Sequence, residues 1–183
     1  FFGFFLTVVL PLSLFELSTG LFALGLTLPL ELSNGTILEN YKIVGDLSNI
    51  AIQIAGNSPS NLAEAAKKAE HYGFAEINLN CGCPSKNVIA GEFGLSLLLN
   101  PTLVKECILS IKEKVKSEIS VKTRIGINYD DNEGLLNDFI KTVNITGIKK
   151  YVIHARNGIL CNMTTKKNLK VPILKYERVY KLK

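Results

Sequence analysis

The feature that most constrains the fold is a regular alternation between short apolar runs and amphipathic runs, from residue 50 to residue 154. The short runs have the composition of buried strands and lie at residues 50–55, 74–80, 119–124 and 150–154. The runs between them are rich in helix formers and lie at residues 61–72, 101–116 and 133–144. Strands and helices that alternate at this spacing predict βαβ units around a parallel sheet.

Length and charge bound the class of protein only loosely. A chain of 183 residues with 47% apolar and 20% charged residues is long enough for one domain with a real core. The net charge of +5 is carried mostly by lysine and permits a polyanionic partner such as a nucleic acid. A solvated, lysine-rich surface explains the same charge equally well.

The cysteines do not predict a metal site. No CxxC pair occurs, and His71 and His154 are the only histidines available to complete a Cys/His cage. We expect no disulfide between Cys81 and Cys83, because a disulfide demands a specific geometry that two such close positions on an extended strand do not provide. Reduced cysteines are the default inside the cell, and we expect Cys107, within a helical pattern, to be a small buried apolar residue.

Residues 1–33 form an apolar segment of uncertain status. Glu16 splits the run, and prolines and glycines interrupt it, so neither half reaches the ~18 apolar residues of a membrane span. No basic region precedes it, and the missing initiator methionine indicates a fragment or a processed product. A buried core piece, or sequence foreign to the domain, is favoured over a membrane or targeting segment. We expect residues 34–183 to form the domain that carries the alternating pattern.

Polar residues gather where each predicted strand ends. In an α/β sheet the carboxyl ends of parallel strands meet at one edge, where functional groups collect. Lys122 and Gln53 lie within otherwise apolar strands, and a buried lysine is costly unless an anion or an acceptor pairs with it. These placements predict one shared site formed by Gln53, Asn78, Asn80, Cys83, Lys122, Arg124, His154 and Arg156.

Two kinds of chemistry suit these residues. Cys83 lies between a glycine and a proline at a strand end and is a candidate acid or nucleophile; a small buried residue beside a turn is the alternative. The cationic side chains at the other strand ends suit phosphate groups, and ion pairs with acidic residues are the alternative. The segment 82–94 is neither a Walker loop nor a GxGxxG fingerprint, so its glycines are expected to shape a loop over the site.

Three motifs carry a specific resemblance. NLNCGCPSKNVIAGEFGLSLL at residues 78–98, VKTRIGI at 121–127 and VIHAR at 152–156 resemble the tRNA-dihydrouridine synthase family, most closely its bacterial A-type branch. The similarity runs from about residue 34 to the C-terminus. Related flavin-dependent barrels share the fold and the lysine but lack this Cys-Pro-Ser loop.

The resemblance implies an α/β fold, a partial (β/α)8 TIM barrel of the FMN-linked oxidoreductase type, followed in the family by a helical tRNA-binding domain. The family reaction reduces a uridine of tRNA to 5,6-dihydrouridine: NADPH reduces FMN, the flavin delivers a hydride to C6, and a cysteine protonates C5. We therefore expect an oxidoreductase with tRNA as its partner, in the cytoplasm by default or in an organelle if the apolar start is a targeting segment. The resemblance implies no metal and no membrane, and it leaves the oligomeric state open.

The matching motifs also imply individual roles. Cys83 matches the family's proton donor, for which a neutral thiol is sufficient. The positions that match FMN-contacting or cofactor-supporting residues are Gln53, Lys122, His154, Arg124 and Arg156. The positions that match tRNA-contacting residues are Asn80 and Lys166.

The chain also departs from the family pattern. Cys81 stands where the family has an apolar residue, and we expect it in the core, facing away from the flavin. Leu169 falls where the related branch has an arginine in its tRNA-facing loop. The first 33 residues do not resemble the family's first strand, and the later strands and the helical domain are missing. Because a partial barrel exposes strand edges, we expect the chain alone to be poorly active or inactive.

Two rival hypotheses remain open. A flavin-dependent barrel oxidoreductase that acts on a small molecule, such as a dihydropyrimidine, would turn over the free base and ignore tRNA. An inactive tRNA-binding remnant would show salt-sensitive tRNA binding without flavin. Cys83, Lys122 and His154 together argue against the remnant, because a pure binding protein needs none of them.

Overall fold

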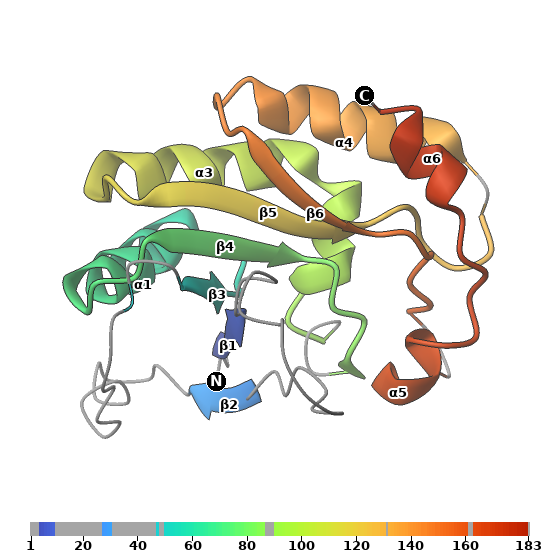
Figure 1. Cartoon of the computed structure of the whole chain (residues 1–183), viewed down its shortest axis with the longest axis horizontal. Helices are drawn as coiled ribbons and strands as arrows, with labels where there is room; N and C mark the ends of the chain where they lie inside the picture. Colours follow the sequence, from blue (N-terminus) through green and yellow to red (C-terminus); the bar gives the residue numbers. More distant parts are fainter. Residues whose placement is uncertain are drawn as a thin grey trace, which may run out of the picture.

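The computed structural model describes residues 4–9, 27–30, 47, 50–86, 90–130, 132–160 and 163–182. Within these residues one sheet has six strands in the order β2-β1-β3-β4-β5-β6 (Figure 1). The last four strands are parallel and pair in chain order: β3 (Ala51–Ile54), β4 (Glu76–Cys81), β5 (Glu118–Arg124) and β6 (Lys150–His154). Their carboxyl ends therefore meet at one edge of the sheet.

A helix follows each of the first three parallel strands and returns the chain to the start of the next one. These helices are α1 (Pro59–His71), α3 (Pro101–Lys114) and α4 (Glu133–Asn144). Figure 1 shows them along the same face of the sheet. A polar side chain caps each helix by accepting a backbone N–H bond from the first turn, and the three caps are Ser58, Asn100 and Asn132.

The sheet has an apolar face and a polar face, because side chains alternate along each strand. The apolar face packs against the helices in one buried cluster. Phe139 on α4 is fully buried there, and burial of such a side chain stabilises the fold by about 1.5–3 kcal/mol. The strand residues in this cluster are Ile52, Ile54, Ile77, Leu79, Cys81, Ile119 and Val121.

The opposite face carries polar residues in register across the strands. Successive rows, each nearer the carboxyl ends, are Gln53–Asn78–Ser120–Lys150, Asn80–Lys122–Val152 and Arg124–His154. In a (β/α)8 barrel this face lines the interior, where side chains from neighbouring strands stack in layers.

Shorter elements complete the described part of the chain. A 3-10 helix, η3 (Gly94–Leu99), follows the cysteine loop, and two short helices, α5 (Thr165–Asn168) and α6 (Tyr176–Tyr180), follow β6. Strand β1 (Phe4–Val9) pairs antiparallel with β2 (Thr27–Leu30) and with β3, so the parallel pattern starts only at β3. Apart from these two strands, the interpretation of residues 1–33 falls outside the described residues.

The predicted fold class is confirmed: four parallel strands alternate with helices in the pattern of a partial (β/α)8 barrel. Every strand and helix expected between residues 50 and 154 forms, with ends that differ by no more than two residues. The pattern missed η3 because GLSLLL is an apolar run without helical periodicity. It missed α5 and α6 because four or five residues are too few to show a period.

Two expected core cysteines are confirmed. Cys81 and Cys107 are fully buried in the apolar cluster. Burial raises the pKa of Cys107 to about 12, and the nearby charge of Glu106 adds to the shift. Both thiols therefore behave as small apolar groups. Of the helices that the structure describes, none has the length and apolar character needed to cross a bilayer.

Candidate active site

A cavity of about 320 Å³ lies at the carboxyl ends of the parallel strands. Predicted site residues from four segments line it: Gln53, Asn80, Cys83, Lys122, Arg124 and His154. Thr165 and Leu169, from the segment around α5, close one side of the cavity. Arg156 and Lys166 are not among the lining residues. The structure therefore brings together six of the eight side chains assigned to the site.

The loop that carries Cys83 is fixed by the side chain of Asn80. Asn80 Oδ1 accepts hydrogen bonds from the backbone N–H groups of Gly82, at 3.1 Å, and Cys83, at 3.0 Å. On the far side, the N–H of Leu95 donates to the carbonyl oxygen of Cys83 at 3.0 Å. The half-buried thiol therefore sits on a backbone that is held from both directions.

Gly82 allows this loop to pass close to strand β5. A Cβ atom added at Gly82 would lie 3.1 Å from the carbonyl carbon of Thr123, a backbone atom that cannot move aside alone. A side chain at residue 82 would therefore push the cysteine loop away from the sheet.

Lys122 is a cation without an acidic partner in the described part of the chain. Its ammonium group lies on the polar face of β5 and lines the cavity. Burial lowers the pKa of Lys122, the charge of Arg124 lowers it further, and Cys83 acts in the opposite direction. The geometry therefore leaves Lys122 available to an anionic or electron-rich ligand.

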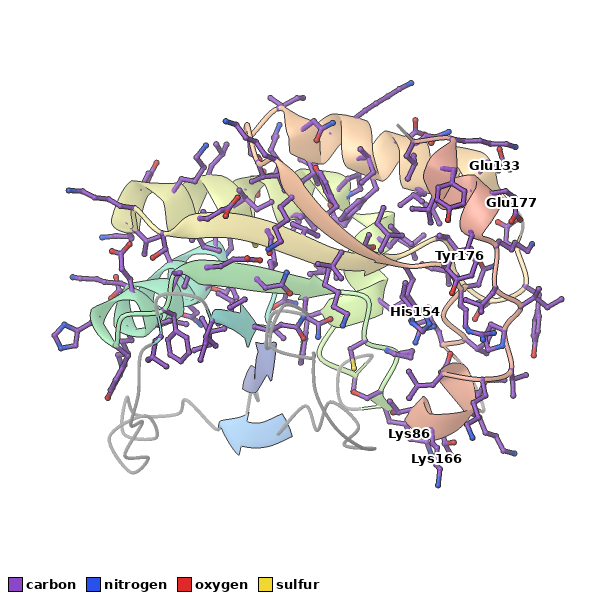
Figure 2. All side chains as sticks on the ribbon, viewed as in Figure 1. Lys86, Glu133, His154, Lys166, Tyr176 and Glu177 are labelled. Atoms are coloured by element: carbon purple, nitrogen blue, oxygen red, sulfur yellow. The ribbon has the colours of Figure 1, made fainter. Side chains whose placement is uncertain are left out.

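His154 lies at the end of β6, toward α5, in the view of Figure 2. Burial lowers the pKa of His154 to about 4, and the charges of Arg124, Arg156 and Lys122 contribute in that order. The imidazole is therefore neutral at pH 7, with one nitrogen that donates a hydrogen bond and one that accepts.

The two arginines of the site hold loops. Arg124 is 4% exposed, and its guanidinium donates to three backbone carbonyls: those of Gly82 at 3.0 Å, Asn157 at 3.0 Å and Asn168 at 3.2 Å. Arg156 donates to the carbonyl of Lys170 at 3.3 Å and to that of Pro172. These bonds tie the cysteine loop and the α5 segment to the strand ends.

Burial does not remove the charge of Arg124 at neutral pH. It lowers the pKa to about 10, an effect that Cys83 opposes and Arg156 reinforces. The predicted cofactor-supporting role of both arginines stays a prediction, and the bonds indicate that any such support acts through the loops.

The two residues assigned to tRNA contacts occupy different places. Asn80 lines the cavity, with its carbonyl oxygen already bonded to the cysteine loop. Lys166 is exposed on α5, and Figure 2 shows it at the same end of the molecule as Lys86. Leu169 follows Lys166 by three residues, is 54% exposed and lines the cavity. Both assignments stay predictions.

Reasoning from strand ends missed residues deeper in the polar face. Glu76, Ser120 and Lys150 join Asn78 in a hydrogen-bonded row beneath the cavity. For Glu76 and Ser120 the signal was in the sequence: polar residues recur at every second position along EINLNC and EISVKTR.

The cavity suits the ring of FMN, the cofactor that the sequence resemblance implies. A flavin ring is planar and rich in nitrogen and oxygen acceptors, and the cavity presents the Lys122 cation with the amide of Gln53 and the imidazole of His154. These three residues would hold the ring. Among the described residues, no group of three or more His, Cys, Asp or Glu side chains could hold a metal ion.

Comparisons with known proteins indicate the family of the chain. A family model described as Dihydrouridine synthase (Dus) matches residues 32–183. Curated proteins named tRNA-dihydrouridine(20/20a) synthase from Shewanella oneidensis, Xanthomonas axonopodis pv. citri and Salmonella typhi are 44%, 43% and 44% identical to the chain over 134, 134 and 135 residues.

These alignments cover 73% of this chain but only 40% or 41% of each relative. The chain thus spans about two fifths of the length of the curated relatives that it matches. Because the family model covers most of the chain, including every parallel strand, this chain belongs to the dihydrouridine synthase family.

Proposed function

We propose that this chain forms part of the catalytic barrel of a tRNA-dihydrouridine synthase, with residues 34–183 as the partial barrel domain. The enzyme reduces the C5–C6 double bond of a uridine in tRNA, with FMN as cofactor and NADPH as reductant. The relatives are named as 20/20a synthases, and we extend that A-type specificity to this protein. The family match and the names of the relatives support the proposal.

The observation that carries the proposal is the position of Cys83 at the cavity, on a loop fixed by Asn80 and near Lys122. FMN, when bound and reduced by NADPH, supplies the hydride that enters C6 of the uracil. Cys83 gives its Sγ proton to C5, and the remaining thiolate takes a proton from water before the next turnover. Hydride and proton together saturate the double bond.

Other residues of the cavity orient the two rings. Lys122 holds the electron-rich edge of the flavin, and Gln53 supplies amide hydrogen bonds. His154 is neutral at pH 7, so it donates a hydrogen bond without adding a fourth positive charge beside Lys122 and the arginines. The backbone bonds of Arg124 keep the cysteine loop and the α5 segment in place around the bound rings.

The tRNA must bring its target base into the cavity from outside. A uridine within folded tRNA has to leave its stack to reach the thiol of Cys83. Lys166 on α5 lies near the side of the cavity that Thr165 and Leu169 close, where it can meet the phosphate backbone.

The test uses a chimaera in which residues 34–183 replace the matching segment of the Shewanella oneidensis relative. We expect Cys83→Ala to retain FMN and to lose tRNA reduction by about 10²–10⁴-fold, the usual contribution of a positioned acid. Dihydrouridine in tRNA is measured by mass spectrometry of nucleosides, and Cys107→Ala is the matched control. Undiminished dihydrouridine formation by Cys83→Ala would contradict the assigned role, and turnover of free dihydropyrimidine without tRNA would favour the small-molecule oxidoreductase.

A further inference from the structure

A continuous series of side-chain hydrogen bonds crosses the polar face of the sheet. At the end remote from the cavity, Lys150 Nζ contacts Glu76 Oε2 at 2.5 Å, and the hydroxyl of Ser120 donates to Glu76 Oε1. Asn78 Nδ2 then donates to Ser120 Oγ at 2.6 Å, and Gln53 Nε2 donates to Asn78 Oδ1 at 2.6 Å.

The series ends at the loop that carries the reactive thiol. Asn80 Nδ2 donates to Gln53 Oε1 at 2.9 Å, and Asn80 Oδ1 accepts the backbone N–H groups of Gly82 and Cys83. We call the six side chains the polar relay; they are Lys150, Glu76, Ser120, Asn78, Gln53 and Asn80.

Both ends of the polar relay fix the direction of every bond in it. The carboxylate of Glu76 can only accept, so the hydroxyl of Ser120 must donate to it and must accept from Asn78. At the other end, backbone N–H groups can only donate, so Asn80 must turn its oxygen toward them. The two requirements agree on one orientation for each of the three amides between them.

The middle of the polar relay is buried, so the loss of one of its hydrogen bonds costs more free energy than it would at the surface. Ser120 is 0% exposed, Asn78 is 2% exposed and Gln53 is 4% exposed. Without a partner, a polar group at such a position loses its hydrogen bond and gains no water in exchange. A change at Ser120 should therefore propagate as a reorientation of the neighbouring amides.

We infer that Glu76, Ser120 and Asn78 are positioning residues for Cys83, acting through the amides of Gln53 and Asn80. The inference rests on the proposed function in that it takes Cys83 as the proton donor. It assigns a task to residues that do not line the cavity.

The relay also determines what Asn80 offers to a ligand. Both lone pairs of Asn80 Oδ1 are engaged by backbone N–H groups, and one N–H of its Nδ2 is engaged by Gln53. Only the second N–H of Asn80 is left for the cavity, so this residue presents a donor and no acceptor. Its matching ligand group is a carbonyl oxygen, such as those of a uracil ring.

The test measures alkylation of Cys83 by iodoacetamide in the 183-residue chain, without flavin or tRNA. Fragment-ion mass spectrometry separates Cys83 from Cys81, and buried Cys107 serves as the internal gauge of general unfolding. We expect Ser120→Ala to speed alkylation of Cys83 about threefold to tenfold while that of Cys107 stays unchanged.

The matched control is Ser117→Ala. Ser117 lies just before β5 and donates its hydroxyl to Glu70 at 2.9 Å, which repeats the serine–glutamate contact of the relay outside it. We expect this variant to leave the Cys83 rate unchanged. An unchanged rate in Ser120→Ala, or a rise shared equally by Cys107, would overturn the inference.

A double-mutant cycle adds a second, independent criterion. Asn80 lies between Ser120 and Cys83 in the relay, so Ser120→Ala should add no further acceleration to a chain that already carries Asn80→Ala. Multiplicative effects of the two changes would show that Ser120 acts by another route and would refute the relay. Because neither readout uses cofactor or substrate, failure of the proposed enzymatic function would leave this result interpretable.

Discussion

Cys81 and Cys83 stand two residues apart but lie in different surroundings. Cys81 ends β4 on the face toward the helices, where it is fully buried and where burial, followed by the charge of Cys107, raises its pKa. Cys83 lies on the loop beyond, half-buried beside the cavity and near Lys122. Two residues along the chain, past the end of the strand, are therefore enough to take a thiol from the interior of the apolar cluster to the lining of the cavity.

After the loss of tRNA reduction in Cys83→Ala, the largest effect that we expect on the cavity side is on cofactor binding. In the chimaera, Lys122→Met should weaken FMN binding about tenfold to hundredfold, because it removes a charge-assisted contact. The same change should leave the fold at least as stable, since burial disfavours the charged form of Lys122. Flavin fluorescence titration measures the first effect and urea unfolding the second.

The control for this prediction is Lys112→Met on the helix side, where Lys112 donates to the carbonyl of Thr146 at 2.7 Å. We expect it to leave FMN affinity unchanged. Equal losses of affinity in the two lysine variants would mean that Lys122 has no special place at the flavin.

The next effect separates the two cysteines directly. Cys81→Ser should lower the free energy of unfolding by about 1–2 kcal/mol, because a hydroxyl without a partner enters the apolar cluster. Cys83→Ser should change it by less than about 0.5 kcal/mol, since a half-buried position lets the hydroxyl reach water. Urea denaturation of the 183-residue chain measures both free energies. Equal losses in the two variants would contradict the assignment of the two thiols to different surroundings.

The smallest expected effect is a pH dependence. The pKa of His154 is about 4 in the folded chain and about 6.5 when unfolded, so the unfolded state takes up a proton first as the pH falls. The stability that neutral His154 provides is complete above about pH 6.5 and is lost as the pH falls toward 4.

This loss is visible as a difference between variants. We expect urea midpoints of the wild-type chain to fall more steeply between pH 6.5 and pH 4 than those of His154→Gln. His71→Gln, at an exposed position on α1, should keep the wild-type slope. Parallel slopes for all three proteins would mean that His154 titrates normally in the fold.

The strands, the helices and most of the cavity were predictable because their signals are local. A period of two in the strands and a period near 3.6 in the helices show which residues face each other, and the strand ends then place Gln53, Lys122 and His154 together. The hydrogen bonds between residues far apart in the chain were not predictable. Arg124 donates to carbonyls 42, 33 and 44 residues away, and such contacts leave no periodic trace in the sequence.

The polar relay has a consequence for how the strands choose their alignment. A slip of two residues between neighbouring strands would keep apolar side chains toward the helices, so hydrophobic packing alone discriminates poorly between the two alignments. The hydrogen bonds do discriminate, because Asn78 must stand opposite both Gln53 and Ser120 to accept from the first and donate to the second. The buried amides therefore act as a register check, which selects one pairing of the strands from several that are nearly equal in apolar burial.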